Sequence, residues 1–218
     1  MLSQPAASLT DLVLGVVILV LALATRPLDV HRYWRRTLWW AAASALAGAV
    51  HHGFVTYSRT WAGPSWAVIS GMVVLTISFS LAATVQEVLG PGRRKQFWLL
   101  RSASLGAYVG LAAFGHYGVG TILACEGLTM VTILALWGIA LHRGHPRAPA
   151  MLVALGASAL AGCARALPAH VTDVVGLDPT SLYHLAQIPG MVLLYVALST
   201  APALQRSKSW TRLAEHGG

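Results

Sequence analysis

Long apolar stretches recur along the chain and are separated by short polar segments. Each is close to the ~20 residues that a helix needs to cross a bilayer. We predict seven transmembrane helices, at about residues 9–25, 37–56, 65–89, 97–115, 119–141, 149–167 and 180–203. The stretches are read as helices because a backbone in hydrocarbon must satisfy its own hydrogen bonds, and the short alternating segments of membrane strands do not occur. The predicted fold is all-α, with a transmembrane domain at 1–204 and a basic tail at 205–218.

Composition supports a membrane protein. The chain is 56% hydrophobic and 10% charged, whereas roughly a quarter of the residues of a soluble domain are charged. The first stretch lacks the basic residues that precede the apolar core of a signal peptide, so it is read as a retained helix. We expect a multi-pass protein of the plasma or inner membrane whose partner is the lipid bilayer.

The basic residues predict the orientation. With seven spans, only Arg59 and Arg165 fall on one side, and the other 13 of the 15 Lys and Arg residues fall on the opposite side. Short cytoplasmic loops are enriched in Lys and Arg, so we predict that the N-terminus lies outside and the C-terminus in the cytoplasm. Because the net charge of +8 is spread over these loops, a nucleic-acid partner is not expected.

Two short motifs suggest an internal repeat. The sequence ASALAG occurs at residues 43–48 and again at 157–162, and GMV occurs at 71–73 and 190–192. The similar offsets would superpose spans one to three on spans five to seven, with span four as a linker. A parallel 3+1+3 repeat of this kind is found in small transporters.

Candidate chemistry gathers at the predicted outer side. Glu126 lies inside span five, where an ionisable side chain is costly and points to function. His51, His116 and His184 lie at outer helix ends, with His170 and Asp173 on the last outer connection. His51 is preferred to His52 because it shares a helical stripe with Ser44 and Gly48. Asp11 is assigned to the first turn of span one, where an acidic residue supports the helix dipole.

Span seven carries the densest polar group. Gln187 follows His184 on one helical face, and Pro189-Gly190 is predicted to interrupt the helix beside a cavity. Gln187, Tyr183 and the outer Arg165 are the candidate substrate-binding residues. Asp178, followed by a proline, is predicted to cap the start of this span.

Imidazoles with a carboxylate suit zinc, which in catalytic sites takes three protein ligands and a water. We therefore predict zinc ligands at His51, His116 and His184, with Glu126 as general base or fourth ligand. Zinc lowers the pKa of its water and so makes a nucleophile for hydrolysis. The chain is predicted to bind a lipid or another small molecule as substrate.

The seven spans, with Ser44 and His51 in the second and His184 in the seventh, resemble the membrane hydrolase superfamily of alkaline ceramidases and adiponectin-type receptors. In that superfamily histidines of the second and seventh helices hold zinc, with an Asp and a Ser nearby, and lipid amides are cleaved. The resemblance implies a lipid hydrolase and a catalytic role for Ser44. The sequence departs from the pattern, because the seventh span has Ile188 where a second histidine is expected and span three has no Asp.

Two other classes of function stay open. A small-solute or proton-coupled transporter would use the 3+1+3 repeat, with Glu126 on the transport path. A heme-binding or accessory membrane subunit would use His51 and His184 as axial ligands. A retinal pump is not expected, because the seventh span contains no lysine for a Schiff base.

Overall fold

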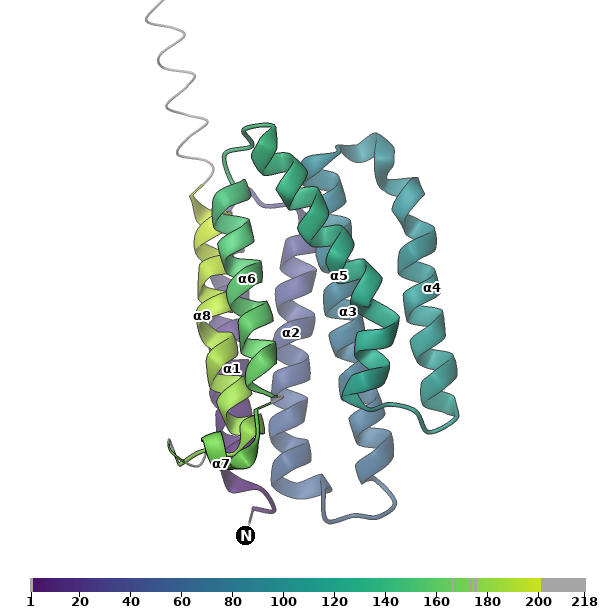
Figure 1. Cartoon of the computed structure of the whole chain (residues 1–218), viewed down its shortest axis with the longest axis vertical. Coiled ribbons are helices and arrows are strands. Elements are labelled where there is room, and N and C mark those ends of the chain that lie inside the picture. The colour runs from purple at the N-terminus through teal and green to yellow at the C-terminus, as the bar shows by residue number, and fades with distance from the viewer. Residues whose placement is uncertain (1, 166, 173, 175, 201–218) are drawn as a thin grey trace, which may run out of the picture.

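Seven long α-helices run up and down between two ends of the molecule in a computed structural model that describes residues 2–165, 167–172, 174 and 176–200 (Figure 1). They are α1 (Pro5–Ala24), α2 (Arg32–Val50), α3 (Ala62–Val88), α4 (Arg94–Ala113), α5 (Val119–His142), α6 (Ala148–Ala164) and α8 (Pro179–Ser199). The all-α prediction is confirmed, and each long helix overlaps a predicted one, although α1 and α2 begin four and five residues earlier than predicted. The predicted tail at 205–218 lies outside the described residues.

Short helices join the long ones. A π-helix, η1 (His51–Val55), continues α2, a 3-10 helix, η2 (Pro91–Arg93), precedes α4, and α7 (Ala169–Thr172) lies between α6 and α8. The described N-terminus, η1, α7 and the α4–α5 connection lie at one end of the bundle, here called the N-terminal end (Figure 1). The α1–α2, α3–α4 and α5–α6 connections lie at the opposite end.

Four of the long helices, α1, α3, α5 and α8, have the length and apolar composition needed to cross a membrane. The complete seven-span topology, its orientation and the 3+1+3 repeat stay predictions. Six helices form a closed circuit of neighbours in the order α1, α2, α3, α5, α6 and α8, and α4 packs outside it against α3 and α5.

The core lies inside this circuit and is built largely from bulky side chains. Trp34, Leu81, Trp137, Met151 and Leu198 are each at most 1% exposed. The two indoles are hydrogen-bonded as well as buried: Trp34 donates to Glu87 at 2.8 Å and Trp137 donates to Thr84 at 3.1 Å. Buried indole N–H groups need such partners, so α2, α3 and α5 are fixed to one another.

Helix α8 differs from its prediction in one respect. Pro189 lies inside a continuous helix, so the predicted interruption at Pro189-Gly190 is wrong. The neighbouring helix explains this, because a packed partner lets a membrane helix tolerate proline. A Cβ on Gly190 would collide with Ser158 of α6, so the glycine serves close helix packing instead.

The start of α8 is as predicted. Asp178 is the N-cap, and its carboxylate accepts hydrogen bonds from the backbone N–H groups of Thr180 at 2.9 Å and Ser181 at 3.0 Å. Partial burial alone would raise the pKa of Asp178, but these bonds and one from the Ser181 hydroxyl outweigh it and lower the pKa. The cap therefore holds the end of the helix that carries His184.

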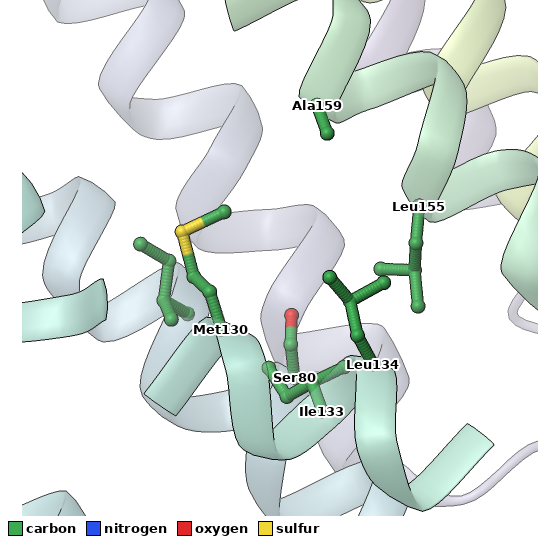
Figure 2. Close-up of a pocket in the computed structure, with 7 residues that line it drawn as sticks. Ser80, Met130, Ile133, Leu134, Leu155 and Ala159 are labelled. Carbon is green, nitrogen blue, oxygen red and sulfur yellow. The ribbon is translucent and has the colours of Figure 1, made fainter. Parts of the chain in front are cut away.

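A hollow of about 100 Å³ separates α3, α5 and α6. The residues that line it include Ser80, Met130, Ile133, Leu134, Leu155 and Ala159, which are labelled in Figure 2. Ser80 brings the single oxygen among these side chains, and its hydroxyl already donates to the carbonyl of Thr76 at 3.0 Å. This hollow is apolar and offers no reactive group.

Candidate metal centre

Three ionisable side chains from three helical segments meet near the N-terminal end. Asp11 comes from α1, His52 from η1 and His184 from α8. One carboxylate oxygen of Asp11 lies 3.4 Å from Nε2 of His184, and the other lies 3.9 Å from Nε2 of His52. One ligand atom from each residue lies within 4.8 Å of the other two, close enough to hold one metal ion. We call this group the Asp–His–His cluster.

The cluster is screened from water. Asp11, His52 and His184 are 5%, 8% and 6% exposed. A charge at such a place is costly unless a partner compensates it. Any charge on these three side chains must therefore be compensated by another group within the cluster.

Close packing of α1 on α2 brings Asp11 into position. Gly48 faces the carboxylate, and a Cβ at this position would collide with Oδ2 of Asp11. One turn toward the N-terminus of α1, the hydroxyl of Ser8 donates to the carbonyl of Ala49 at 2.8 Å. Small residues that let two helix backbones approach are typical of membrane helix pairs. Here they make room for a carboxylate.

The π-helix η1 carries His52 at the end of α2. Its wide turn is closed by the hydrogen bond from the backbone N–H of Thr56 to the carbonyl of His51, at 3.1 Å. Single π turns in α-helices often occur at functional sites. The start of the chain is bonded to the same segment, because the N–H groups of Ser3 and Gln4 donate to the carbonyls of Gly53 and His52, each at 3.0 Å. Gln4 is thereby held beside the cluster.

Hydrogen bonds on the far side of each imidazole decide which nitrogen carries the proton. Nδ1 of His52 lies 2.6 Å from the amide oxygen of Gln4, which can only accept, so Nδ1 is the donor. Nδ1 of His184 lies 3.2 Å from the hydroxyl of Thr10. That hydroxyl already donates to the carbonyl of Ala6 at 2.9 Å, so it accepts from His184. Both neutral rings therefore carry their proton on Nδ1.

The Nε2 atoms then present lone pairs to a carboxylate. Nε2 of His52 is buried and has no hydrogen-bond partner among the described residues. Two lone pairs and an anion repel one another unless a cation lies between them, and this cation is a proton or a metal ion. Histidines that bind metals almost always donate their other N–H to an acceptor that orients the ring, and both rings show this arrangement.

Two imidazoles and one carboxylate form a common ligand set. Three protein ligands with an open position are typical of catalytic zinc, and two histidines with one carboxylate also suit non-heme iron. The structure thus contains a buried group that could bind a metal, as predicted. Zinc as the ion, and heme as the alternative, stay predictions.

Of the three predicted ligands, His184 alone belongs to the cluster. Nδ1 of His51 lies 2.8 Å from the hydroxyl of Ser65, and its ring packs against Trp66 at 5.3 Å between centroids. His116 is exposed in the connection after α4. Residues three and four positions after Gly48 share its helical face, so periodicity could not choose between His51 and His52. The position of α1 makes that choice.

The predicted catalytic residues lie elsewhere. The hydroxyl of Ser44 donates to the carbonyl of Ala41 in its own helix, at 2.9 Å. Glu126 is fully buried in α5, neither of its oxygens has a hydrogen-bond partner among the described residues, and it is not part of the cluster. The chemical roles assigned to Ser44 and Glu126 stay predictions.

The predicted substrate-binding residues are spread around α6 and α8. The ring of Tyr183 packs beside that of His184, with 5.5 Å between centroids. Gln187 donates to the carbonyl of Ser158 at 3.4 Å, and Arg165 is exposed at the end of α6. Of the weaker candidates on the last outer connection, Asp173 and the side chain of His170 lie outside what the structure describes.

Asp11 is the main residue that the sequence analysis misassigned. The first span was predicted to begin at residue 9, which would put Asp11 in the first turn, but α1 begins at Pro5. Asp11 is therefore buried well inside the helix, and an acid in that place is a functional candidate. The signal was Gln4-Pro5, because proline favours the first position of a helix.

Comparison with known proteins gives one match. No curated protein and no solved structure matches the chain. A family model covers residues 6–202, which include every helix from α1 to α8 except the first residue of α1, and all three residues of the Asp–His–His cluster. The chain therefore belongs to this family, described as a family of unknown function (DUF6962).

Proposed function

We propose that this chain is an integral membrane protein that binds zinc between Asp11, His52 and His184 and uses it to hydrolyse a lipid-like substrate. One observation carries the proposal: two buried Nε2 atoms, each with its lone pair set by a bond on the far side of the ring, face one carboxylate. Zinc satisfies all three groups at once.

The ligand set leaves room for chemistry. With three protein ligands, zinc keeps a position for water and lowers the pKa of that water toward neutrality. In this proposal Asp11 supplies the negative charge, and the two rings supply neutral nitrogens. Gln4 and Thr10 hold the rings in the binding tautomer. Tyr183, which packs on His184, forms part of the substrate contact.

The origin of the two histidines agrees with the resemblance noted in the sequence. His52 follows the second long helix and His184 lies on the last one. In the alkaline ceramidases and adiponectin-type receptors, zinc is held by histidines of the second and seventh helices. This agreement favours hydrolysis of a lipid amide or ester over the transporter.

The membrane part of the proposal rests on helix composition and on the surface. Four helices could cross a membrane. The outward face of α1 exposes Leu9, Val13, Val16 and Val20, which are 47–57% exposed, as lipid-facing residues would be. We propose that all seven long helices cross the bilayer, with the N-terminal end outside, so the metal centre lies near the outer surface.

Metal analysis of the purified, detergent-solubilised protein tests the proposal. We expect one zinc per chain after equilibration with zinc, and a loss of thermal stability on chelation that zinc reverses. Asp11→Asn and His184→Gln should each lose the metal, because either change removes one of three ligands. His116→Gln, which removes an exposed histidine outside the cluster, should retain it.

Two results would overturn the metal centre: wild-type protein without stoichiometric metal whose stability ignores both chelator and zinc, or zinc retained by both cluster variants. A Soret band in the visible spectrum would replace zinc with the heme alternative. Fluorogenic lipid amides and esters then test the reaction, which should require zinc and Asp11. A zinc-loaded protein inactive on all of them would overturn the hydrolase and leave the metal site standing.

A further inference from the structure

A second hollow, lined by two arginines, lies at the end of the bundle opposite the Asp–His–His cluster, where α3 ends, α4 begins and α5 ends. It is about 380 Å³ and is lined by Val88, Leu89, Arg93, Phe97 and Arg143. We call it the two-arginine pocket. It shares no residue with the Asp–His–His cluster, and the proposed hydrolysis does not use it.

Two tight turns bring the arginines together. Gly90, with φ of +80°, turns the chain from α3 into η2, and the N–H of Arg93 donates to its carbonyl at 3.4 Å. Arg143 is the C-cap of α5 and precedes Gly144, which has φ of +72°. Positive φ values favour glycine. The two turns thus bring Arg93 and Arg143, from two different connections, to the lining of the same hollow.

The positive charge of the pocket is not compensated by the described part of the chain. Neither Arg93 nor Arg143 forms an ion pair with a carboxylate there. The acid nearest in sequence is Glu87, and both of its oxygens are engaged, one by Arg147 at 2.7 Å and the other by the indole of Trp34 at 2.8 Å. Two like charges brought together on separate turns are stabilised by an anion between them.

The other residues that line the pocket indicate which class of anion would bind there. Val88, Leu89 and Phe97 are partly buried apolar side chains, and Trp98, 63% exposed, follows Phe97. The pocket lies at the ends of α3 and α5, two helices that could cross a membrane. Tryptophan is enriched at the level of lipid headgroups. A ligand with a negative group and an apolar body at that level is a phospholipid.

We propose that the two-arginine pocket binds the phosphate of an anionic phospholipid in the membrane leaflet at this end of the bundle. Guanidinium groups bind phosphate oxygens in a planar, bidentate manner. Basic pockets between membrane helices bind anionic headgroups in this way. Val88, Leu89 and Phe97 receive the first carbons of the lipid, and the lipid ties the α3–α4 turn to the end of α5.

The test uses the full chain in detergent, with phosphatidylglycerol and phosphatidylcholine as probes. Native mass spectrometry counts bound lipid, and thermal unfolding measures its effect. We expect phosphatidylglycerol to bind and stabilise wild-type protein more than phosphatidylcholine does. In Arg93→Gln/Arg143→Gln, binding should weaken roughly 10- to 30-fold. The control Arg26→Gln/Lys95→Gln removes the same charge from the same end and should bind as wild type does.

Three outcomes would overturn the proposal. Equal binding of the two lipids would exclude selection by charge. Equal weakening in both double variants would show a diffuse surface charge and no pocket. Protection by glycerol phosphate as strong as by phosphatidylglycerol would overturn the lipid source, since a soluble phosphate compound would then be the ligand. A pocket variant that fails to fold is replaced by Arg93→Lys/Arg143→Lys, which keeps the charge and loses the bidentate contact, so it should bind phosphatidylglycerol more weakly than wild type does while still preferring it to phosphatidylcholine.

Discussion

At the residue scale, the candidate metal centre depends on side chains that would not touch the metal. Gln4 and Thr10 each bond the outer nitrogen of one imidazole and so direct the inner lone pair toward Asp11. Neither residue type is a frequent zinc ligand, and no spacing in the sequence marks them. Outer partners of this kind orient the ligands and raise their basicity.

Gln4→Ala removes the acceptor for Nδ1 of His52 and frees the ring to change tautomer. We expect zinc affinity to fall by roughly 10- to 100-fold, measured by competition with a chromogenic chelator. Gln187→Ala is the matched control, because that glutamine bonds to Ser158 outside the cluster. Equal affinities of Gln4→Ala and wild type would show that the amide does not orient the ring.

At the element scale, the site requires α1 and α2 to approach closely. Gly48 borders the Asp11 carboxylate, Gly15 borders the Leu46 side chain and Gly53 borders the Ser8 hydroxyl. Each contact lies along one seam between α1 and α2 or η1. The glycines along this seam therefore serve the site as well as helix packing. A bulkier residue at Gly48 would move the Asp11 carboxylate away from both imidazoles.

Gly48→Ala tests this seam. The added Cβ collides with Oδ2 of Asp11, so we expect a loss of about 1–3 kcal/mol of stability, measured by unfolding in detergent, together with weaker zinc binding. Gly156→Ala on α6 is the control, because nothing lies within 4 Å of its Cβ position. That control should be neutral or slightly stabilised, because alanine favours helix. A Gly48→Ala protein with unchanged stability and zinc content would contradict the close approach.

At the scale of the whole molecule, the two ends of the bundle carry different chemistry. The Asp–His–His cluster lies near the N-terminal end, and the two-arginine pocket lies at the opposite end. Ten of the 15 Lys and Arg residues lie in or near the α1–α2, α3–α4 and α5–α6 connections at that opposite end, at positions 26–36, 93–101 and 143–147. The charge bias predicts that this end faces the cytoplasm, which would place the metal centre toward the outside.

Labelling of single cysteines tests the orientation. In a protein whose native Cys125 and Cys163 are replaced by serine, Arg59→Cys should react with an impermeant maleimide on intact cells. Lys95→Cys should react only after permeabilisation. Both positions are exposed, so the membrane alone should separate them. The reverse pattern would place the metal centre on the cytoplasmic side.

The sequence by itself determined the all-α class, the approximate positions of seven long helices and the cap at Asp178. Those features follow from local patterns, because apolar length, proline and N-cap residues act within a few turns. It also predicted that histidines and a carboxylate would meet near one end, and it identified His184 among them. The other predicted site residues, His51, His116 and Glu126, were selected from their positions along separate helices, and none of them belongs to the cluster.

Only the tertiary structure decided which side chains converge. His51 and His52 are neighbours in sequence, and their roles depend on which side of α2 the first helix packs. Asp11 joins the cluster because α1 begins four residues earlier than predicted and meets Gly48. The pocket at Arg93 and Arg143 likewise depends on two connections that are distant in sequence. Helix periodicity describes one helix at a time, whereas a site is set by the rotation and approach of several helices, which long-range packing determines.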